Sequence, residues 1–218
     1  MKSILTSLVL GLVTIWSFGQ TTEYPKGAYM SYEEILSKSP SVSAELEIER
    51  RTKGDIKMSG GNDYKLFKPD KSIKKKTIKK KYYAYSDGDS LYINCIHYKI
   101  QAWYTPVLSE GRFFVIRGGI STDPKIQKEQ LDNQAQLGYM FGAVGGAFQG
   151  AKLAMLRFIY VIDKETNQIT TVSNDYLKEC LQETPELLNQ YEAEEEQVDQ
   201  KIFLKYLRLL NEKTNANN

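Results

Sequence analysis

Seven lysines within eleven residues form a dense set of charged side chains that could recognise a ligand: Lys71, Lys74, Lys75, Lys76, Lys79, Lys80 and Lys81. Near a charged surface each ammonium group is worth up to about 1 kcal/mol, so the run could attract anionic lipid headgroups or polyanionic glycans. The neighbouring Ile73 and Ile78 share a face neither at a period of two nor at helical spacing. We therefore expect an exposed edge strand or loop, where lysines also prevent unwanted strand pairing.

Aromatic side chains follow the lysines and supply a second candidate surface: Tyr82, Tyr83, Tyr85, Tyr92, Tyr98, Trp103 and Tyr104. Exposed rings on a sheet could form a platform for a sugar or a peptide, because they combine apolar area with a polar tip. Strands are also rich in aromatic residues for packing alone, so core and cross-strand contacts are the default expectation. The candidate binding residues are Lys74, Lys75, Lys76, Lys79, Lys80, Lys81, Tyr83 and Tyr85.

Side chains that catalysis or metal binding would require are scarce. The chain has one histidine, His97, and two cysteines, Cys95 and Cys180. These cannot supply zinc with four thiolates, with two thiolates and two imidazoles, or with three imidazoles. We interpret His97 as a structural residue and the pair Asp87 and Asp89 as part of a turn. We predict no catalytic residue, metal or cofactor, and keep a hydrolase that uses two carboxylates as an alternative.

Four glycines recur at four-residue intervals, at Gly138, Gly142, Gly146 and Gly150. On a helix they would form a stripe along which another backbone can approach closely. Glycine costs a helix up to about 1 kcal/mol per residue, so the stripe indicates a compensating close contact. The first interpretation is a helix packed across the protein's own sheet. The alternative is self-association or membrane insertion, since residues 135–151 carry no charge.

The N-terminus has the pattern of a secretory signal peptide. Lys2 precedes an apolar run over residues 4–18, and the small residues Ser17 and Gly19 stand where a signal peptidase requires them. The run is shorter than the roughly 20 residues that span a bilayer, so we expect cleavage of residues 1–19. In an exported chain Cys95 and Cys180 could form a disulfide, or both could be small buried apolar residues.

The composition is that of a globular domain with an uneven distribution of charge. The 218 residues are 41% apolar and 26% charged, which excludes a wholly disordered or collagen-like chain. Without residues 1–19 the chain has 28 basic and 27 acidic side chains, a net charge of +1, so nucleic acid is a poor partner. Residues 41–120 carry 16 basic and 9 acidic side chains, whereas residues 121–218 carry 10 and 15. The two regions should attract each other.

The order of predicted elements indicates an α+β fold. Alternating patterns and turn residues predict strands at 44–49, 82–87, 89–98, 100–108, 112–117, 156–162 and 168–172, with turns at Gly54, Gly60, Gly61 and Gly88. Helices are expected at 32–37 behind a Ser31–Glu34 capping box, at about 124–149, after Ser173, after Thr184 and at about 194–211. We predict an antiparallel meander or sheet, with the glycine-rich central helix and the C-terminal helices packed on it. Residues 20–213 would be one domain, and residues 214–218 a disordered tail.

Several segments resemble a family of uncharacterised exported proteins of Gram-negative bacteria. They are KGAYMSYEE at 26–34, SLYIN at 90–94, the glycine stripe, and FIYVIDKETNQ at 158–168. The resemblance implies export and a single domain, and it brings no activity with it.

The sequence therefore predicts a non-enzymatic, exported cell-envelope protein that acts through binding or structural contact. It would lie in the periplasm, at the outer membrane or outside the cell. Its partner would be an envelope protein, a glycan or a membrane surface, or a second copy through the glycine stripe. One alternative is a glycan- or peptide-binding module that uses exposed rings, and another is the carboxylate-based hydrolase.

Overall fold

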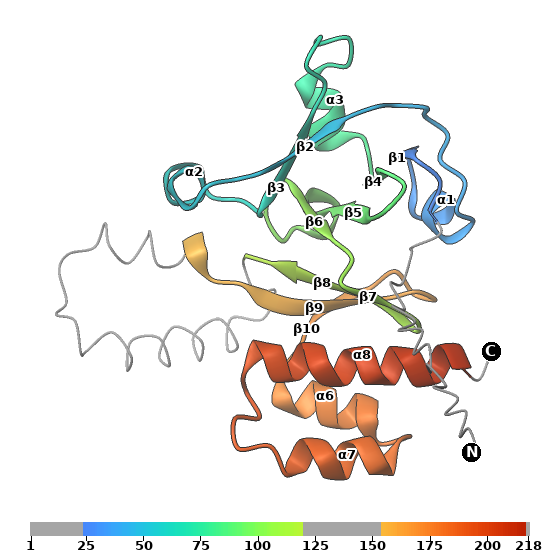
Figure 1. The fold of residues 1–218 in the computed structure, drawn as a ribbon, viewed down its shortest axis with the longest axis vertical. Coiled ribbons are helices and arrows are strands. Elements are labelled where there is room, and N and C mark those ends of the chain that lie inside the picture. The colour runs from blue at the N-terminus through green and yellow to red at the C-terminus, as the bar shows by residue number, and fades with distance from the viewer. Residues whose placement is uncertain (1–23, 120–153, 217–218) are drawn as a thin grey trace, which may run out of the picture.

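The computed structural model describes residues 24–119 and 154–216, which form two antiparallel sheets and a set of helices (Figure 1). The predicted signal peptide and the glycine stripe at Gly138, Gly142, Gly146 and Gly150 lie outside these residues. In the described part, the two sheets face each other and the C-terminal helices cover the far side of the second sheet. The predicted α+β class is confirmed.

The first sheet, sheet A, has six strands in the order β1-β4-β5-β6-β3-β2. Their bounds are Gly27–Tyr29, Ala84–Ser86, Leu91–Asn94, Tyr104–Pro106, Tyr64–Phe67 and Glu47–Arg50. The predicted hairpin is present, with Tyr85 paired to Tyr92 across a turn that contains Gly88. The predicted strand at 44–49 begins only at Glu47, but the predicted alternation holds, since Ala44 and Leu46 just before β2 are buried and Ile48 is half-buried between exposed glutamates.

The second sheet, sheet B, has four strands in the order β10-β9-β8-β7, with bounds Ile169–Thr171, Phe158–Asp163, Phe113–Gly118 and Ser109–Glu110. Successive side chains of a strand point to opposite faces. Phe114 and Tyr160 therefore join the cluster between the sheets, whereas Phe113 and Ile159 join the cluster under the helices. Both faces of β8 and β9 are buried, which accounts for their nearly continuous apolar sequences.

The helical layer consists of α6 (Asn174–Leu181), α7 (Pro185–Glu192) and α8 (Gln200–Ala216). The Ser173 hydroxyl caps α6 by accepting from the Tyr176 N–H, and Pro185 stands in the first turn of α7, as predicted. Helix α8 begins later than expected and continues to Ala216, beyond the predicted end at residue 211. Thr214, which we placed in the tail, donates its hydroxyl to the Leu210 carbonyl within this helix.

Shorter helices flank sheet A. Helix α1 (Tyr32–Leu36) is capped by Ser31, which accepts from the Glu34 N–H as the sequence indicated. Helix α2 (Lys53–Ser59) contains Gly54, so the predicted turn there is wrong; a capping box between Thr52 and Asp55 starts the helix instead. The predicted strand 89–98 ends early, because residues Cys95–Tyr98 form the 3-10 helix η1.

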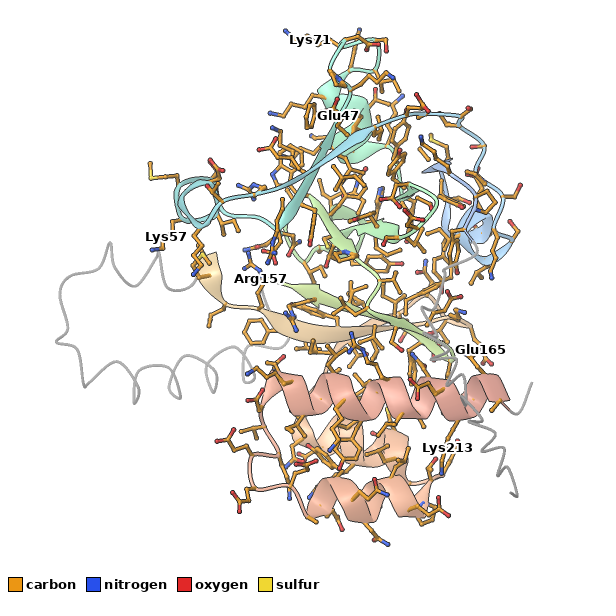
Figure 2. The ribbon with its side chains drawn as sticks, in the orientation of Figure 1. Glu47, Lys57, Lys71, Arg157, Glu165 and Lys213 are labelled. Carbon is orange, nitrogen blue, oxygen red and sulfur yellow. The ribbon has the colours of Figure 1, made fainter. Side chains whose placement is uncertain are left out.

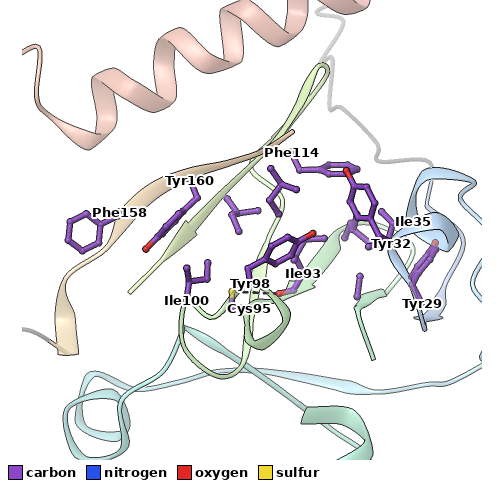
Figure 3. Packing of buried hydrophobic residues seen from close by; sticks show 14 of the residues in the cluster. Tyr29, Tyr32, Ile35, Ile93, Cys95, Tyr98, Ile100, Phe114, Phe158 and Tyr160 are labelled. Carbon is purple, nitrogen blue, oxygen red and sulfur yellow. Dashed lines mark hydrogen bonds between the residues drawn. The ribbon is translucent and has the colours of Figure 1, made fainter. Parts of the chain in front are cut away.

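Three apolar clusters hold these layers together. The largest lies between the sheets and includes Ile93, Cys95 and Phe158 (Figure 3). The second lies between sheet B and the helices, and the third covers the outer face of sheet A. Cys95 is in the first cluster, Cys180 packs against the second, and both thiols are free. The structure therefore contains no Cys95–Cys180 disulfide.

Candidate functional site: a cationic cluster around Trp103

The centre of the lysine run, Lys75–Lys80, forms a helix, so the expected exposed edge strand or loop is wrong there, whereas Lys71 lies in an exposed loop. Helix α3 (Lys75–Lys80) packs on the outer face of sheet A through Ile78, which is 1% exposed. The buried Tyr104 hydroxyl donates to the Ile78 carbonyl at 2.5 Å. A helix of six residues needs only one apolar anchor, and so short a helix has no repeating pattern for sequence analysis to detect.

Two lysines of α3 converge on the ring of Trp103. The Nζ atoms of Lys75 and Lys79 lie 5.5 and 5.1 Å from the ring centroid. The two residues are four apart on the helix, so their side chains project from the same side. The Cζ atom of Arg51, which follows β2, lies 6.0 Å from the same centroid. These distances are within the range of cation–π attraction.

The loop that carries Trp103 has a strained backbone. Lys99, Gln101 and Trp103 have φ angles of 59°, 88° and 78°, a region that side chains other than glycine seldom adopt. Asn62 holds the loop in place, because its backbone N–H donates to the Ala102 carbonyl and its amide donates to the Ile100 carbonyl. A strained conformation of this kind persists only where the surrounding contacts determine it.

Gly61 allows the loop to pack tightly against the segment before β3. Its φ angle is +92°, and a Cβ atom there would lie 2.8 Å from Trp103 Cδ1 and 2.9 Å from an Arg51 guanidinium nitrogen. Glycine is therefore required for both the backbone conformation and the space. The close approach places the indole directly beside the guanidinium.

Arg51 is 8% exposed, and its guanidinium group donates to three backbone carbonyls, those of Asp55, Gly60 and Asn62. Within residues 24–119 and 154–216, no ion pair joins a carboxylate to Arg51 or to the α3 lysines. The pKa of the Asp55 carboxyl group is lowered mainly by hydrogen bonds from Thr52, and to a smaller extent by Arg51. The positive charge of the cluster is thus largely uncompensated.

A half-buried ion pair connects the Gly61 segment to sheet B. The Arg157 guanidinium donates to the Asp63 carboxylate through Nε at 2.8 Å and through a terminal nitrogen at 2.5 Å. Figure 2 shows the position of Arg157 just before β9. Its other terminal nitrogen donates to the carbonyls of Ala154 and Leu156. Arg157 precedes β9 and Asp63 precedes β3, so the pair fixes the Gly61 segment against the neighbouring sheet.

Most of the predicted aromatic platform is core. Five of the seven rings are less than 9% exposed: Tyr82, Tyr85, Tyr98, Trp103 and Tyr104. Tyr85 exchanges hydrogen bonds with the Leu46 backbone, and the half-buried Tyr83 stacks on His97 with 4.4 Å between ring centroids. Tyr83 and Tyr85 therefore do not join the lysine cluster. The exposed ring surface that a sugar platform needs is absent from these five residues.

The remaining chemical groups have structural partners. His97 Nε2 lies 3.1 Å from the Tyr82 carbonyl oxygen, and Asp87 accepts from the Asp89 and Ser90 N–H groups of its own turn. No group of three or more histidine, cysteine, aspartate or glutamate side chains that could hold a metal ion occurs among the residues described.

The hydrolase hypothesis requires two carboxyl groups that face one another. Two of the more enclosed carboxylates are paired with cations instead, Glu110 with Lys164 at 2.7 Å and Asp63 with Arg157. No contact in the described part of the chain therefore supports that hypothesis. In the same part of the chain, no helix is both long enough and apolar enough to cross a membrane.

A family model described as a family of unknown function, DUF6563, matches residues 27–214. The chain belongs to this family. The match begins at β1 and ends within α8, so DUF6563 includes both sheets, the helical layer and the Trp103 cluster. It confirms the expected membership of an uncharacterised family. No curated protein and no solved structure matches the chain.

In this DUF6563 member, Lys75 and Lys79 belong to the lysine run and Trp103 to the aromatic residues that the sequence pattern indicates, whereas no pattern indicates Arg51. Arg51 and Trp103 are separated by 52 positions along the chain. The Gly60-Gly61 turn was the only local signal near Arg51, because it indicates a close backbone approach without identifying the partner. Contacts between distant segments leave no periodic pattern in one sequence.

Proposed function

We propose that this protein is an exported, non-enzymatic component of the cell envelope that binds a polyanionic glycan through the surface of α3. The observation that carries the proposal is the set of cations Arg51, Lys74, Lys75, Lys76, Lys79, Lys80 and Lys81, none of which forms an ion pair with a carboxylate among the described residues. Elsewhere in the described chain some lysines and arginines pair, as Lys65 does with Glu49, and others, such as Lys57, do not, so what distinguishes α3 is the density of its unpaired cations. The surface of α3 therefore keeps its charge for a partner.

A glycan suits this surface better than a bilayer does. Proteins that lie on membranes combine basic residues with exposed apolar or aromatic side chains that enter the interface. The large exposed apolar residues of the described chain are Met30, Leu36, Met58 and Val198, and none of them is on α3. Trp103 itself is covered by the cations around it. Charge alone remains as the means of attraction, as in the binding of a soluble polyanion.

Export is supported by the signal-peptide pattern of residues 1–19 and by the family-like segments that follow it. Cell fractionation tests location and charge-dependent contact together. The expected result is a mature chain that begins at Gln20, sediments with the envelope at low ionic strength, and is released by a high-salt wash, because salt screens the attraction between lysines and a polyanion.

Mass spectrometry of the N-terminus gives the cleavage site, and immunoblotting of each wash gives the mode of attachment. A chain that keeps Met1 and stays in the cytoplasm would contradict export. A chain released only by detergent would show that attachment is through a lipid or an integral protein, and this would contradict binding through charge.

A further inference from the structure

The cations of the α3 surface are not equivalent, because three of them converge on one aromatic ring. Lys75 and Lys79 come from α3 and Arg51 from the end of β2, and all three lie within 6.0 Å of the Trp103 ring centroid. Like charges four residues apart on a helix repel each other. An arrangement that gathers three cations, none of them in an ion pair with a described carboxylate, is unfavourable in the free protein, and a bound anion would relieve the repulsion.

The backbone under this cluster is strained in order to place the ring there. Gln101 and Trp103 have positive φ angles of 88° and 78°, which are uncommon for large side chains. Asn62 bonds to the loop and Gly61 packs closely against it, and the Arg157–Asp63 pair holds the segment to which both belong. Such strain concentrates at binding sites, where a fixed geometry matters more than local stability. The gathering of three cations and the strain of the backbone are independent observations, and both concern Trp103.

We propose that Arg51, Lys75 and Lys79 around Trp103 form a discrete site for a sulfate or phosphate monoester group carried by a glycan. The proposal rests on the proposed function and adds which residues recognise the ligand and which part of the ligand they recognise. The Arg51 guanidinium has five N–H groups, and it makes three hydrogen bonds to backbone carbonyls. It therefore retains donors for an oxyanion. Trp103 is only 8% exposed, and recognition is therefore of the charged group rather than of a sugar face.

Helix α3 also contains a matched control pair. Lys76 and Lys80 are likewise four residues apart, and in the described part of the chain neither lies over an aromatic ring. Both are exposed, as Lys75 is, whereas Lys79 is half-buried. Replacing either pair by alanine removes two charges from the same short helix. A difference between the two double variants therefore reports position and not net charge.

Trp103 provides a specific optical signal. The chain has two tryptophans, and the other one, Trp16, lies in the predicted signal peptide. In the chain from Gln20 onward, intrinsic tryptophan fluorescence comes from Trp103 alone. The probe is dextran sulfate, titrated at low salt into the wild-type chain, into Lys75→Ala/Lys79→Ala and into Lys76→Ala/Lys80→Ala, with neutral dextran as the ligand control.

The expected result is a saturable change in Trp103 fluorescence with dextran sulfate and none with neutral dextran. Loss of two charge-assisted contacts should weaken binding about tenfold or more in Lys75→Ala/Lys79→Ala, whereas the control pair should lose about threefold or less. Inorganic sulfate and inorganic phosphate should compete for the site. Thermal melts of both variants establish that they are folded.

Equal losses in the two double variants would overturn the discrete site and would leave general polyanion binding by α3 intact. Failure of the wild-type chain to bind dextran sulfate would overturn the proposed function together with the site. Tighter binding to vesicles that contain anionic phospholipid than to dextran sulfate, with the same dependence on Lys75 and Lys79, would overturn the assignment to a glycan.

Discussion

At the scale of single residues, buried asparagines connect segments that are distant in the sequence. Asn62 joins the Gly61 segment to the Trp103 loop, and Asn94 donates to the carbonyls of Lys79 and Tyr82 beneath α3. Asn211 of α8 donates to Ser109 Oγ and to the Phe113 carbonyl, and it accepts from the Phe113 N–H. Each of these amides satisfies buried backbone groups that would otherwise lose their hydrogen bonds.

Replacement of Asn211 by alanine should therefore be costly. It leaves the buried N–H of Phe113 without its partner, whereas the Phe113 carbonyl still accepts from the Gly111 N–H. An unsatisfied buried group costs about 1–3 kcal/mol. We expect Asn211→Ala to lower the free energy of unfolding by about 1–3 kcal/mol in urea titrations. Asn215→Ala, four residues later on the same helix, removes an exposed hydrogen bond to the Glu110 carbonyl. This variant should change the free energy of unfolding little. Similar losses of unfolding free energy in both variants would show that the buried hydrogen bonds of Asn211 contribute no more to stability than the exposed one of Asn215.

At the scale of elements, hydrogen-bonded carboxylates join α8 to α7 and to the segment between the two helices. Lys213 of α8 pairs with Glu186 of α7 at 2.8 Å, and Glu194, just before α8, accepts from Lys205 at 2.6 Å and from Tyr206 at 2.9 Å. Hydrogen bonds from the lysines lower the pKa of both carboxyl groups below the ordinary value of 4.5. The stability they contribute is therefore present above pH 4.5 and is lost as the pH falls through their lowered pKa values.

We expect Glu186→Gln/Glu194→Gln to be less stable than the wild-type chain at pH 6, with a difference that shrinks as the pH falls below 4.5. Urea unfolding followed by far-UV circular dichroism at a series of pH values measures this. Glu195→Gln/Glu196→Gln removes the same two charges from exposed residues, and neither makes an ion pair with another described residue. The prediction is wrong if both double variants show the same dependence on pH.

Elements that depend on local signals could be predicted from the sequence, and those that depend on distant partners could not. The caps Ser31 and Ser173 and the turn at Gly88 act within four residues, so their helices and hairpin were expected. Helix α3 forms because Ile78 and Tyr104 meet beneath it, a contact across 26 residues. The candidate site follows the same rule, since the lysines are visible in the sequence whereas Arg51 and the strained Trp103 loop are brought to them by the fold.

At the scale of the whole molecule, sheet B separates two apolar cores and contributes one face to each of them. The even-numbered residues of β8 and β9, such as Phe114 and Ile162, pack toward sheet A, and the odd-numbered ones, such as Phe113 and Ile159, pack toward the helices. Further bonds join the N-terminal part to sheet B, because Tyr24 donates to Glu110, which also pairs with Lys164. Loss of either core would expose one face of the same strands.

The two cores should therefore unfold together. Trp103 fluorescence reports the sheet A side, and far-UV circular dichroism is dominated by the helical layer, so coincident urea midpoints are expected of one cooperative unit. Ile159→Val, a change on the helical side that typically costs about 0.5–1.5 kcal/mol, should shift both midpoints equally. A shift confined to the circular dichroism signal, with the Trp103 midpoint unchanged, would mean that sheet A folds as a separate unit. The Trp103 site would then be independent of the helical layer.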